Sequence, residues 1–553
     1  MENILLLLAV ILCGSSSLLS LFCVSKRIRT LAYILWCLTV LSITISVLLM
    51  ITYLISSRFE FQYVYSHSSL DTALIYRISS LWSGQEGSFL LWALILGIMG
   101  FFVLRLKGSG RQKSFGIYSA ISFCIFLMCL ITQPFAKTEF MFSDGLGLTA
   151  ALKDPWMVVH PPLVFISYSA MAVLFSLFPS LKNSSEPDAF DLIITWLRIS
   201  WFFLGLGIFS GSIWAYRALG WGGYWAWDPI ENAALVPWLI ICSFLHQKRY
   251  NFGAVCFIPF TVACFGVFLA RSGILKDQSS HAYAQGNIIV TGIITTFILA
   301  VILFLAITSF RKRHTVKLIN GLNKFSSLFM HNSINIYAGL IFLGTISPII
   351  FKYDTPISYY ALVSIAFVLI YSFNLLLLDK EWLKRKSTLM IVGSTVLIIG
   401  IIILFHTAEV WWLLLIWLVF MPLSLWLVCG FRTKRRNYYL CHIGVVLLII
   451  GAISSSSLGT KAYIIVNPAV SKIIEIEGLN IPVTELTKGD MLIKSLPTKD
   501  LLIQSSQMLT LQQGDLMIPY ITKPLIILFW LGSFIIIAQP LILIIIDRLS
   551  RKH

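Results

Sequence analysis

The sequence predicts an all-α polytopic membrane protein of about fifteen transmembrane helices, with a small external β-rich insert near the C-terminus. Of the 553 residues, 58% are hydrophobic and 12% are charged. Soluble domains carry about twice that charged fraction. Apolar runs near the length that crosses a bilayer recur along the chain, and in lipid such runs satisfy their backbone groups as helices.

The expected spans follow one another with short connections. The first has the acidic Glu2 where a secretion signal would be basic, so we expect it to be a retained span. The spans cover 4–24, 31–55, 88–106, 117–133, 161–180, 194–215, 233–247, 254–270, 287–310, 334–351, 357–378, 387–406, 410–431, 439–457 and 523–546.

Groups of basic residues follow the odd-numbered spans and set the expected orientation, although the loop at 181–193 after the fifth span has only Lys182. By the positive-inside rule, the N-terminus lies outside and the C-terminus lies in the cytoplasm. The same loops account for much of the net charge of +17, which therefore does not indicate a nucleic-acid partner. The basic groups lie at 26–29, 105–113, 248–249, 311–317, 384–386, 432–436 and 548–552.

Three regions make up the expected organisation. Residues 1–457 form the helical bundle, 458–522 form the external insert, and 523–553 form the last helix and a cytoplasmic tail. Stretches such as KAYIIV alternate apolar and polar residues and predict a few short strands in the insert. The ten cysteines lie in or beside the spans without CxxC or CxxCH, which excludes a disulfide relay or a covalently attached c-type haem on this chain.

The most informative segment is the external loop at 216–238, which contains WGGYWAWDPIENAALVPW. Dense aromatic rings suit a flat hydrophobic ligand, and glycines let the backbone approach it. The alternative is an interfacial aromatic belt. A belt does not explain Asp228, Pro229, Glu231 and Asn232 among the rings, so we favour a binding site.

Four of the nine histidines pair by expected depth. His160 and His281 lie at the outer face on either side of the loop, as bis-axial ligation of a haem requires. His246 and His442 lie near the cytoplasmic ends of two antiparallel spans, where a pair could hold a haem b. The alternatives are polar residues at span ends for the first pair and interhelical hydrogen bonds for the second. The others, with His406 kept as a reserve ligand, lack such pairing: His67, His314, His331, His406 and His553.

Several motifs together resemble one family. The aromatic loop resembles the tryptophan-rich WWD signature of haem-handling membrane proteins, and the whole resembles the CcmF-type subunit of cytochrome c haem lyase. The loop alone would also fit haem-export and CcsA-type proteins. The similarity is strong from about 50 to 310 and looser beyond. Further motifs that carry it are YRISSLWSGQEGSFLLW at 76–92, HPPLVFISY at 160–168 and ARSGILKDQSSHAYA at 270–284.

The resemblance implies an enzyme that attaches haem to the CxxCH cysteines of apocytochrome c through thioether bonds. His160 and His281 would bind this substrate haem, and His246 and His442 would bind a haem b that supplies reduction, with quinol as an expected electron donor. A shelf for the external haem would comprise Trp221, Gly222, Gly223, Trp225, Trp227 and Asp228.

Other roles stay open at this stage. Arg217 and Arg271 would pair with haem propionates or anchor the interface, with equal weight. Asp228 would orient the loop or take part in proton transfer, the former being favoured. Glu86 is a candidate for quinol binding or loop stabilisation.

Implied partners are apocytochrome c, a haem chaperone, thiol-reducing and other maturation subunits, and membrane lipid. Tyr224 and Ala226 depart from the family, which often has Trp and Phe there, and the insert is short. A paralogue dedicated to nitrite reductase maturation therefore remains an alternative, as does a haem transporter or chaperone. A quinone or proton-pumping subunit would need Lys and Glu in the middle of several spans, and the sequence has almost none there.

Overall fold

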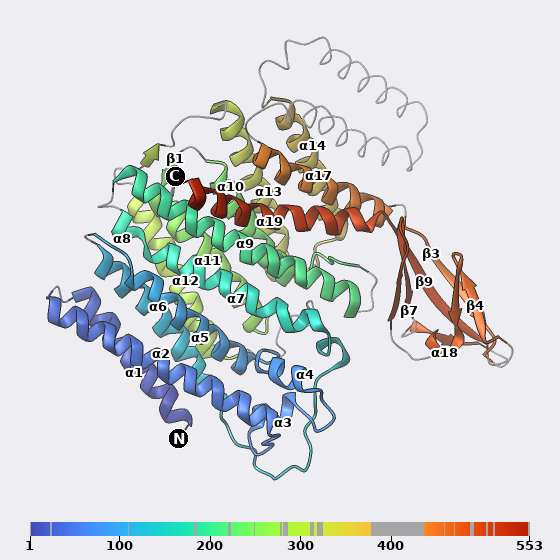
Figure 1. Cartoon of the computed structure of the whole chain (residues 1–553), viewed down its shortest axis with the longest axis horizontal. Helices are drawn as coiled ribbons and strands as arrows, with labels where there is room; N and C mark the ends of the chain where they lie inside the picture. Colours follow the sequence, from blue (N-terminus) through green and yellow to red (C-terminus); the bar gives the residue numbers. More distant parts are fainter. Residues whose placement is uncertain are drawn as a thin grey trace. The chain divides into compact units, whose positions relative to one another are not determined.

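A computed structural model describes most of the chain, and the fold is mainly helical (Figure 1). The chain divides into two compact units, one of Met1–Gly211 with Ala226–Val363 and one of Ser212–Trp225 with Ser364–His553. The described residues are 2–22, 25–108, 110–181, 185–218, 223–247, 249–276, 279, 286–309, 315–317, 324–377, 436–457, 459–468, 471–486, 491–504, 507–511 and 515–550.

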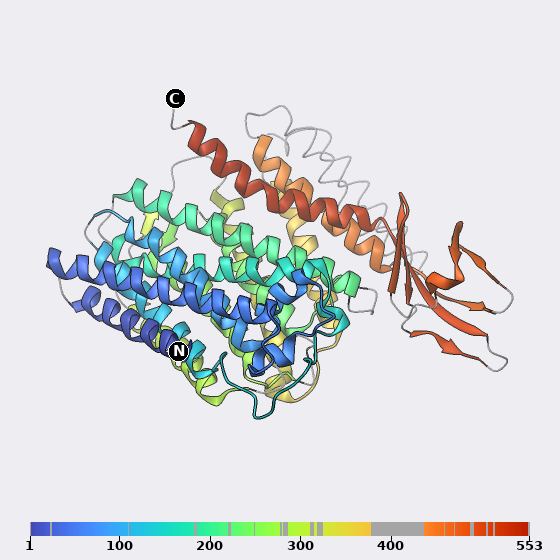
Figure 2. The same cartoon turned by 60° about the horizontal axis from the view of Figure 1, so that its bottom comes forward.

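The first unit is a bundle of long helices that run side by side in both views (Figures 1 and 2). Within the described residues, nine helices of the chain are long and apolar enough to cross a membrane. The predicted helical membrane fold is confirmed, but the number fifteen is not, because the predicted spans 387–406 and 410–431 lie outside the described residues. The long helices are α1 (Glu2–Phe22), α2 (Lys26–Ile55), α5 (Gln85–Leu104), α6 (Arg111–Ile131), α7 (Pro155–Ser176), α9 (Glu186–Ala218), α10 (Pro229–Leu245), α11 (Phe252–Arg271), α12 (Ile288–Ser309), α13 (Lys324–Phe351) and α14 (Ile357–Leu377).

Small polar side chains join the first helices of this bundle. The hydroxyl of Ser16 in α1 donates to the Ala32 carbonyl of α2 at 2.8 Å. The hydroxyl of Ser17 donates to the Gly116 carbonyl of α6 at 3.0 Å. In an apolar environment, small residues let helices approach and supply hydrogen bonds between them. The serines of these spans therefore serve packing.

Short elements connect the long helices of the first unit. Between α2 and α5 the chain forms α3 (Gln62–His67), α4 (Leu74–Ser79) and η1 (Ser80–Trp82), which hydropathy did not predict. Between α6 and α7 lies η2 (Ala150–Leu152), and α8 (Phe178–Leu181) follows α7. The strands β1 (Arg249–Asn251) and β2 (Thr315–Lys317) pair antiparallel.

In the second unit, α17 (Arg436–Ser457) packs along α19 (Ile526–Ser550) (Figures 1 and 2). A Cβ on Gly451 would lie 2.2 Å from the Phe529 backbone nitrogen, so a glycine permits this close contact. Between the two helices lies the predicted strand insert, which is confirmed as a β-rich segment. It contains β3 (Lys461–Val466), β4 (Ile473–Ile476), β5 (Leu479–Pro482), α18 (Val483–Leu486), β6 (Met491–Ser495), β7 (Lys499–Gln504), β8 (Leu509–Thr510) and β9 (Leu516–Pro524).

The insert is built around one antiparallel sheet. Its strand order is β3-β9-β7-β6, with β8 also paired to β9, and β4 and β5 form a separate hairpin. In β3, Ile464 lies opposite Ile518, and in β7 Leu502 lies opposite Ile521. Val466, Leu501, Ile503 and Ile518 are buried in its core. The alternation of KAYIIV reflects the two faces of β3.

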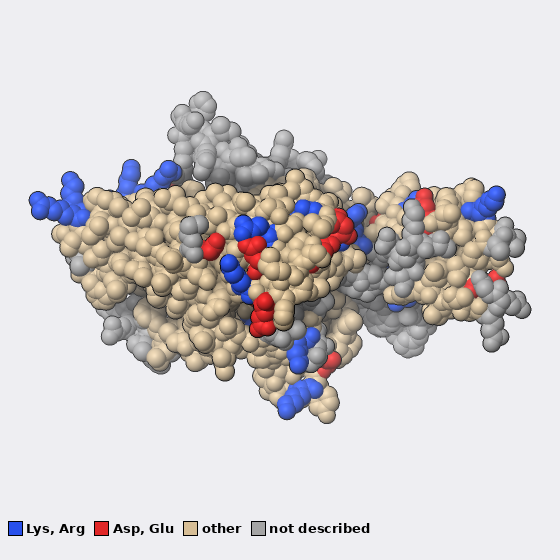
Figure 3. Space-filling view, turned by 90° about the horizontal axis from the view of Figure 1, so that it is seen from below, with Lys and Arg blue, Asp and Glu red and all other residues tan. Residues whose placement is uncertain are grey.

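Charged side chains are unevenly distributed over the surface. Figure 3 shows Lys and Arg at the left end of the molecule and a mixed group of both signs near the middle, with a mostly tan surface between them. An apolar band flanked by charges is what a membrane-spanning bundle presents to lipid.

Candidate functional site

The second half of the aromatic loop is fixed by a helix cap. Asp228 is the N-cap of α10, and its Oδ1 accepts a hydrogen bond from the Ile230 amide at 2.7 Å. Glu231 returns the bond, because its Oε2 accepts from the Asp228 amide at 3.2 Å and from the Ala226 amide at 2.9 Å. This reciprocal pattern is a capping box. The Ser279 hydroxyl also donates to Asp228 Oδ1 at 2.8 Å, which ties the cap to the segment after α11.

Trp227 has a left-handed backbone with φ of +59°, a conformation that is uncommon for a residue with a side chain. Two contacts hold it there. Its ring stacks on Tyr360 of α14, with centroids 4.9 Å apart and planes within 4°. The Asn232 side-chain amide donates to the Trp227 carbonyl at 3.0 Å. Trp227 therefore presents a ring whose orientation is set by α10 and α14.

His160 lies in the second turn of α7 and is seated against α9. Its Nδ1 donates to the Gly207 carbonyl at 2.7 Å. This bond assigns the proton to Nδ1 and the lone pair to Nε2, the arrangement that metal-ligating histidines commonly have. A Cβ on Gly211 would lie 2.8 Å from Cε1 of the ring and 2.9 Å from Nδ1. Gly207 and Gly211, one turn apart on α9, thus form the surface on which this imidazole packs.

Arg271 ends α11 and is buried. Its Nη2 donates to the Ser88 hydroxyl of α5 at 2.6 Å, and its guanidinium lies 5.0 Å from the centre of the Phe89 ring. Because Ser88 follows the SGQEG sequence, the α5 motif and the start of the ARSG motif are in direct contact. Glu86, in the first turn of α5, belongs to the same motif.

His67 lies in α3, among the connections before α5. Its ring stacks on Tyr63, with centroids 4.3 Å apart, and its Nδ1 donates to the Tyr63 carbonyl at 2.9 Å. Burial lowers the pKa of His67, and the nearby Glu86 carboxylate opposes this shift. The side chain therefore favours its neutral form in the folded protein.

His246 caps the end of α10, and its Nδ1 donates to the Cys242 carbonyl at 2.8 Å. As in His160, this bond leaves the lone pair on Nε2. Sequence reasoning missed its neighbour His331 in α13. The His331 Nδ1 donates to the Ser243 carbonyl at 3.0 Å, and its Nε2 accepts from Gln247 at 2.5 Å and from Asn335 at 3.0 Å.

His331 is therefore an interhelical hydrogen-bonding residue, with both ring nitrogens engaged. Ser243 completes the cluster by donating to the Asn335 side-chain oxygen at 2.7 Å. Polar residues spaced three or four apart on α10 and α13 were a signal that could have found this contact.

The remaining predicted residues divide between the second unit and undescribed positions. Arg217 is exposed at the end of α9, and Gly223 and Trp225 are half-buried. Tyr224 between them packs on Phe529 of α19, with ring centroids 4.0 Å apart. His442 of α17 is parallel to Tyr371, with centroids 6.1 Å apart. Outside the described residues lie Trp221, Gly222 and His281, and also His314 and His406.

The predicted histidine pairs thus stay predictions. His281 is not described, and His246 and His442 belong to different units. The contact of Tyr360 with Trp227 was not predicted, since nothing in the sequence of α14 relates it to the loop.

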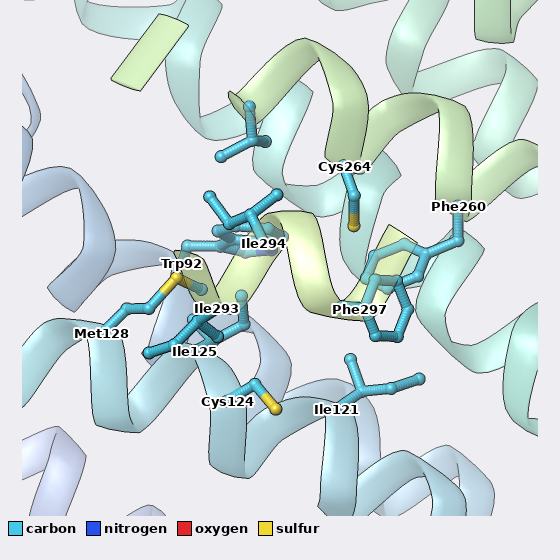
Figure 4. Close-up of a pocket in the computed structure, with 11 residues that line it drawn as sticks. Trp92, Ile121, Cys124, Ile125, Met128, Phe260, Cys264, Ile293, Ile294 and Phe297 are labelled. Atoms are coloured by element: carbon cyan, nitrogen blue, oxygen red, sulfur yellow. The ribbon is translucent and has the colours of Figure 1, made fainter. Parts of the chain in front are cut away.

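A separate cavity of about 30 Å³ lies among α5, α6, α11 and α12 (Figure 4). Its lining is apolar, apart from the thiols of Cys124 and Cys264, and contains no histidine. A cavity of this size accommodates about a water molecule and not a macrocycle. The residues that line it are Trp92, Ile121, Cys124, Ile125, Met128, Phe260, Cys264, Val267, Ile293, Ile294 and Phe297.

Comparison with known proteins agrees with these motifs. Residues 82–275 match the family model described as cytochrome C assembly protein. CcmF of Escherichia coli strain K12, a cytochrome c-type biogenesis protein, is 31% identical over 56% of this chain and 51% of its own length. NrfE of Haemophilus influenzae, also a cytochrome c-type biogenesis protein, is 28% identical over 85% of this chain and 80% of its own length.

The chain spans only about half the length of several other curated relatives. For one of them, the alignment covers 48% of the relative's own length. A solved structure of the cytochrome c haem lyase CcmF shares the fold, with a TM-score of 0.69 and 18% identity over 98% of this chain and 97% of that chain. The predicted resemblance to CcmF-type proteins is confirmed: the chain is a multi-pass membrane protein that is similar to CcmF and other proteins of cytochrome c biogenesis.

Proposed function

We propose that this chain is a haem lyase subunit of cytochrome c maturation, which holds haem at the outer face of a bacterial inner membrane while apocytochrome c is joined to it. The observation that carries the proposal is His160, whose Nδ1 donates to the Gly207 carbonyl at 2.7 Å. Because this bond places the ring proton on Nδ1, the lone pair is on Nε2, the atom that would ligate a haem iron.

The reaction needs positioning more than covalent catalysis. Each cysteine thiol of the acceptor adds across one haem vinyl group, so that a C–S bond forms and the thiol hydrogen moves to the other vinyl carbon, with no net change in electrons. The thiolate is the nucleophile, so the acceptor must arrive reduced, from a thiol-reducing partner. The chain contributes by holding the vinyl groups beside the thiols.

The loop residues would present the haem. Trp227 is oriented by Tyr360 and by the Asp228 cap, which supports the loop-orienting role of Asp228. Trp221, Gly222, Gly223 and Trp225 would complete the shelf, and His281 would supply the second ligand. Arg217 and Arg271 would pair with propionates; the contact of Arg271 with Ser88 equally suits an anchoring role.

His246 and His442 would hold a haem b. The bond from His246 Nδ1 to the Cys242 carbonyl fits such a ligand, because it leaves Nε2 with its lone pair. When bound, this group would pass electrons from quinol and keep the external haem iron ferrous. A haem chaperone would supply the external haem, and apocytochrome c would receive it.

The test is the optical and redox spectrum of the purified protein beside a His246→Ala, His442→Ala double variant. We expect a reduced b-type signal in the native protein that the double variant loses while external haem is retained. His331→Gln is the matched control, since His331 is a histidine next to α10 whose ring is engaged in hydrogen bonds. It should keep the b-type signal.

An unchanged spectrum in the double variant would mean that the inner pair is structural. One exchangeable haem and no second signal would instead indicate a haem transporter or chaperone. The acceptor class is tested by holocytochrome yield, with nitrite reductase assayed beside other c-type cytochromes, which separates the general from the dedicated form.

A further inference from the structure

Helix α7 has a break in its hydrogen bonding beside His160. In an α-helix the amide of residue i donates to the carbonyl of residue i−4. Pro161 has no amide hydrogen, so the Met157 carbonyl lacks its donor within the helix. A carbonyl left without a donor in an apolar environment costs free energy.

Trp82 supplies the missing donor. Its indole Nε1 donates to the Met157 carbonyl at 3.3 Å. Met157 lies three residues before His160 and therefore on the same side of the helix. The indole thus contacts the turn of α7 that carries the imidazole.

The position of Trp82 is itself fixed by Tyr63 of α3. The Tyr63 hydroxyl is within 2.8 Å of the Ser80 carbonyl and 2.9 Å of the Leu81 carbonyl, and it accepts from the Gly84 amide at 3.1 Å. A Cβ on Gly84 would lie 2.5 Å from His67 Nε2, so any larger residue there would displace the His67 ring. The segment that carries Trp82 is therefore held on both sides.

We propose that Trp82 is a positioning residue for His160: its indole replaces the hydrogen bond that Pro161 removes and so fixes the turn that aims the imidazole at the external haem. This inference rests on the proposed function, because it assigns His160 to that haem. The LWSGQEG motif would then support the haem site indirectly, because its side chains would contact neither the haem nor the acceptor.

The experiment titrates haemin into purified full-length protein and takes the signal lost in His160→Ala as the signal of the outer site. Trp82→Phe keeps an aromatic ring but removes the hydrogen-bond donor, and it should weaken this binding about three- to tenfold. It should also shift the midpoint potential of the outer haem, which a purely structural role would not do. Tyr118→Phe is the matched control, because it keeps an aromatic ring and removes a bond of 2.7 Å from the Tyr118 hydroxyl in α6 to the Leu96 carbonyl in α5.

Pro161→Ala tests the cause. It restores an amide that can donate to the Met157 carbonyl, so Trp82→Phe should have little further effect on haemin binding in this background. An equal loss in both backgrounds, or no loss in either, overturns the proposal. If Pro161→Ala does not fold, the ultraviolet resonance Raman difference between native protein and Trp82→Phe decides whether the indole N–H donates a hydrogen bond; a free N–H overturns the proposal.

Failure of the proposed function would look different. The native protein would then show no haemin signal that depends on His160. The same pair of substitutions, measured on the melting temperature without haem, would still be non-additive if the hydrogen bond forms.

Discussion

The position of the His160 ring against α9 depends on a single residue, Gly211. An alanine there would place its Cβ 2.8 Å from the ring, so the imidazole or α9 must move. We expect Gly211→Ala to lengthen the bond to the Gly207 carbonyl and to weaken His160-dependent haemin binding about tenfold. Gly292→Ala in α12 is the control, since a Cβ there meets nothing within 4 Å. Equal effects of the two substitutions on haemin binding would show that Gly211 does not position the His160 ring.

His67 makes stability depend on pH. Because burial lowers its pKa, the unfolded chain binds more protons than the folded chain between that lowered value and the ordinary value of about 6.5. The contribution is present above pH 6.5 and is lost as the pH falls through the lowered pKa. We therefore expect the melting temperature to fall from pH 7.5 to 5 more steeply in the native protein than in His67→Gln. Parallel curves would refute this assignment.

At the scale of the element, the α10 cap separates two roles of Asp228. Asp228→Ala removes the acceptor of the Ile230 amide and should cost about 1 kcal/mol. Asp228→Asn keeps an acceptor oxygen and loses the charge. If the residue acts by orienting the loop, Asn should retain most of the holocytochrome yield while Ala loses it. If Asn loses as much as Ala at an unchanged melting temperature, proton transfer is the role.

The bounds of elements show what hydropathy reads and what it misses. Two helices begin earlier than their predicted spans. The span predicted at 31–55 is α2, which begins at Lys26 after the Ser25 cap. The span predicted at 233–247 is α10, which begins at Pro229 after the Asp228 cap. Polar first turns carry no hydropathy signal, although the caps were legible in the sequence. The strand KAYIIV was predicted correctly, since one of its faces is buried against the insert core.

For the whole molecule, the sequence was sufficient for the helical membrane fold and for the family resemblance. The sequence predicted the depth of each histidine in the membrane, but depth does not determine which helices are neighbours. That is why His331 appeared unrelated to α10, and why the Tyr360 stack on Trp227 had no signal. The partner of the Met157 carbonyl was hidden for the same reason, because Trp82 is 75 residues away along the chain.

The proline in the second turn of α7 constrains how sequences related to this chain can diverge. The Met157 carbonyl needs a donor, which in this chain is the Trp82 indole and which in a chain without Pro161 could be the peptide amide of residue 161. A lineage that loses the tryptophan is free to do so once position 161 is no longer proline. In relatives, the two positions should therefore covary, although 79 residues separate them in this sequence.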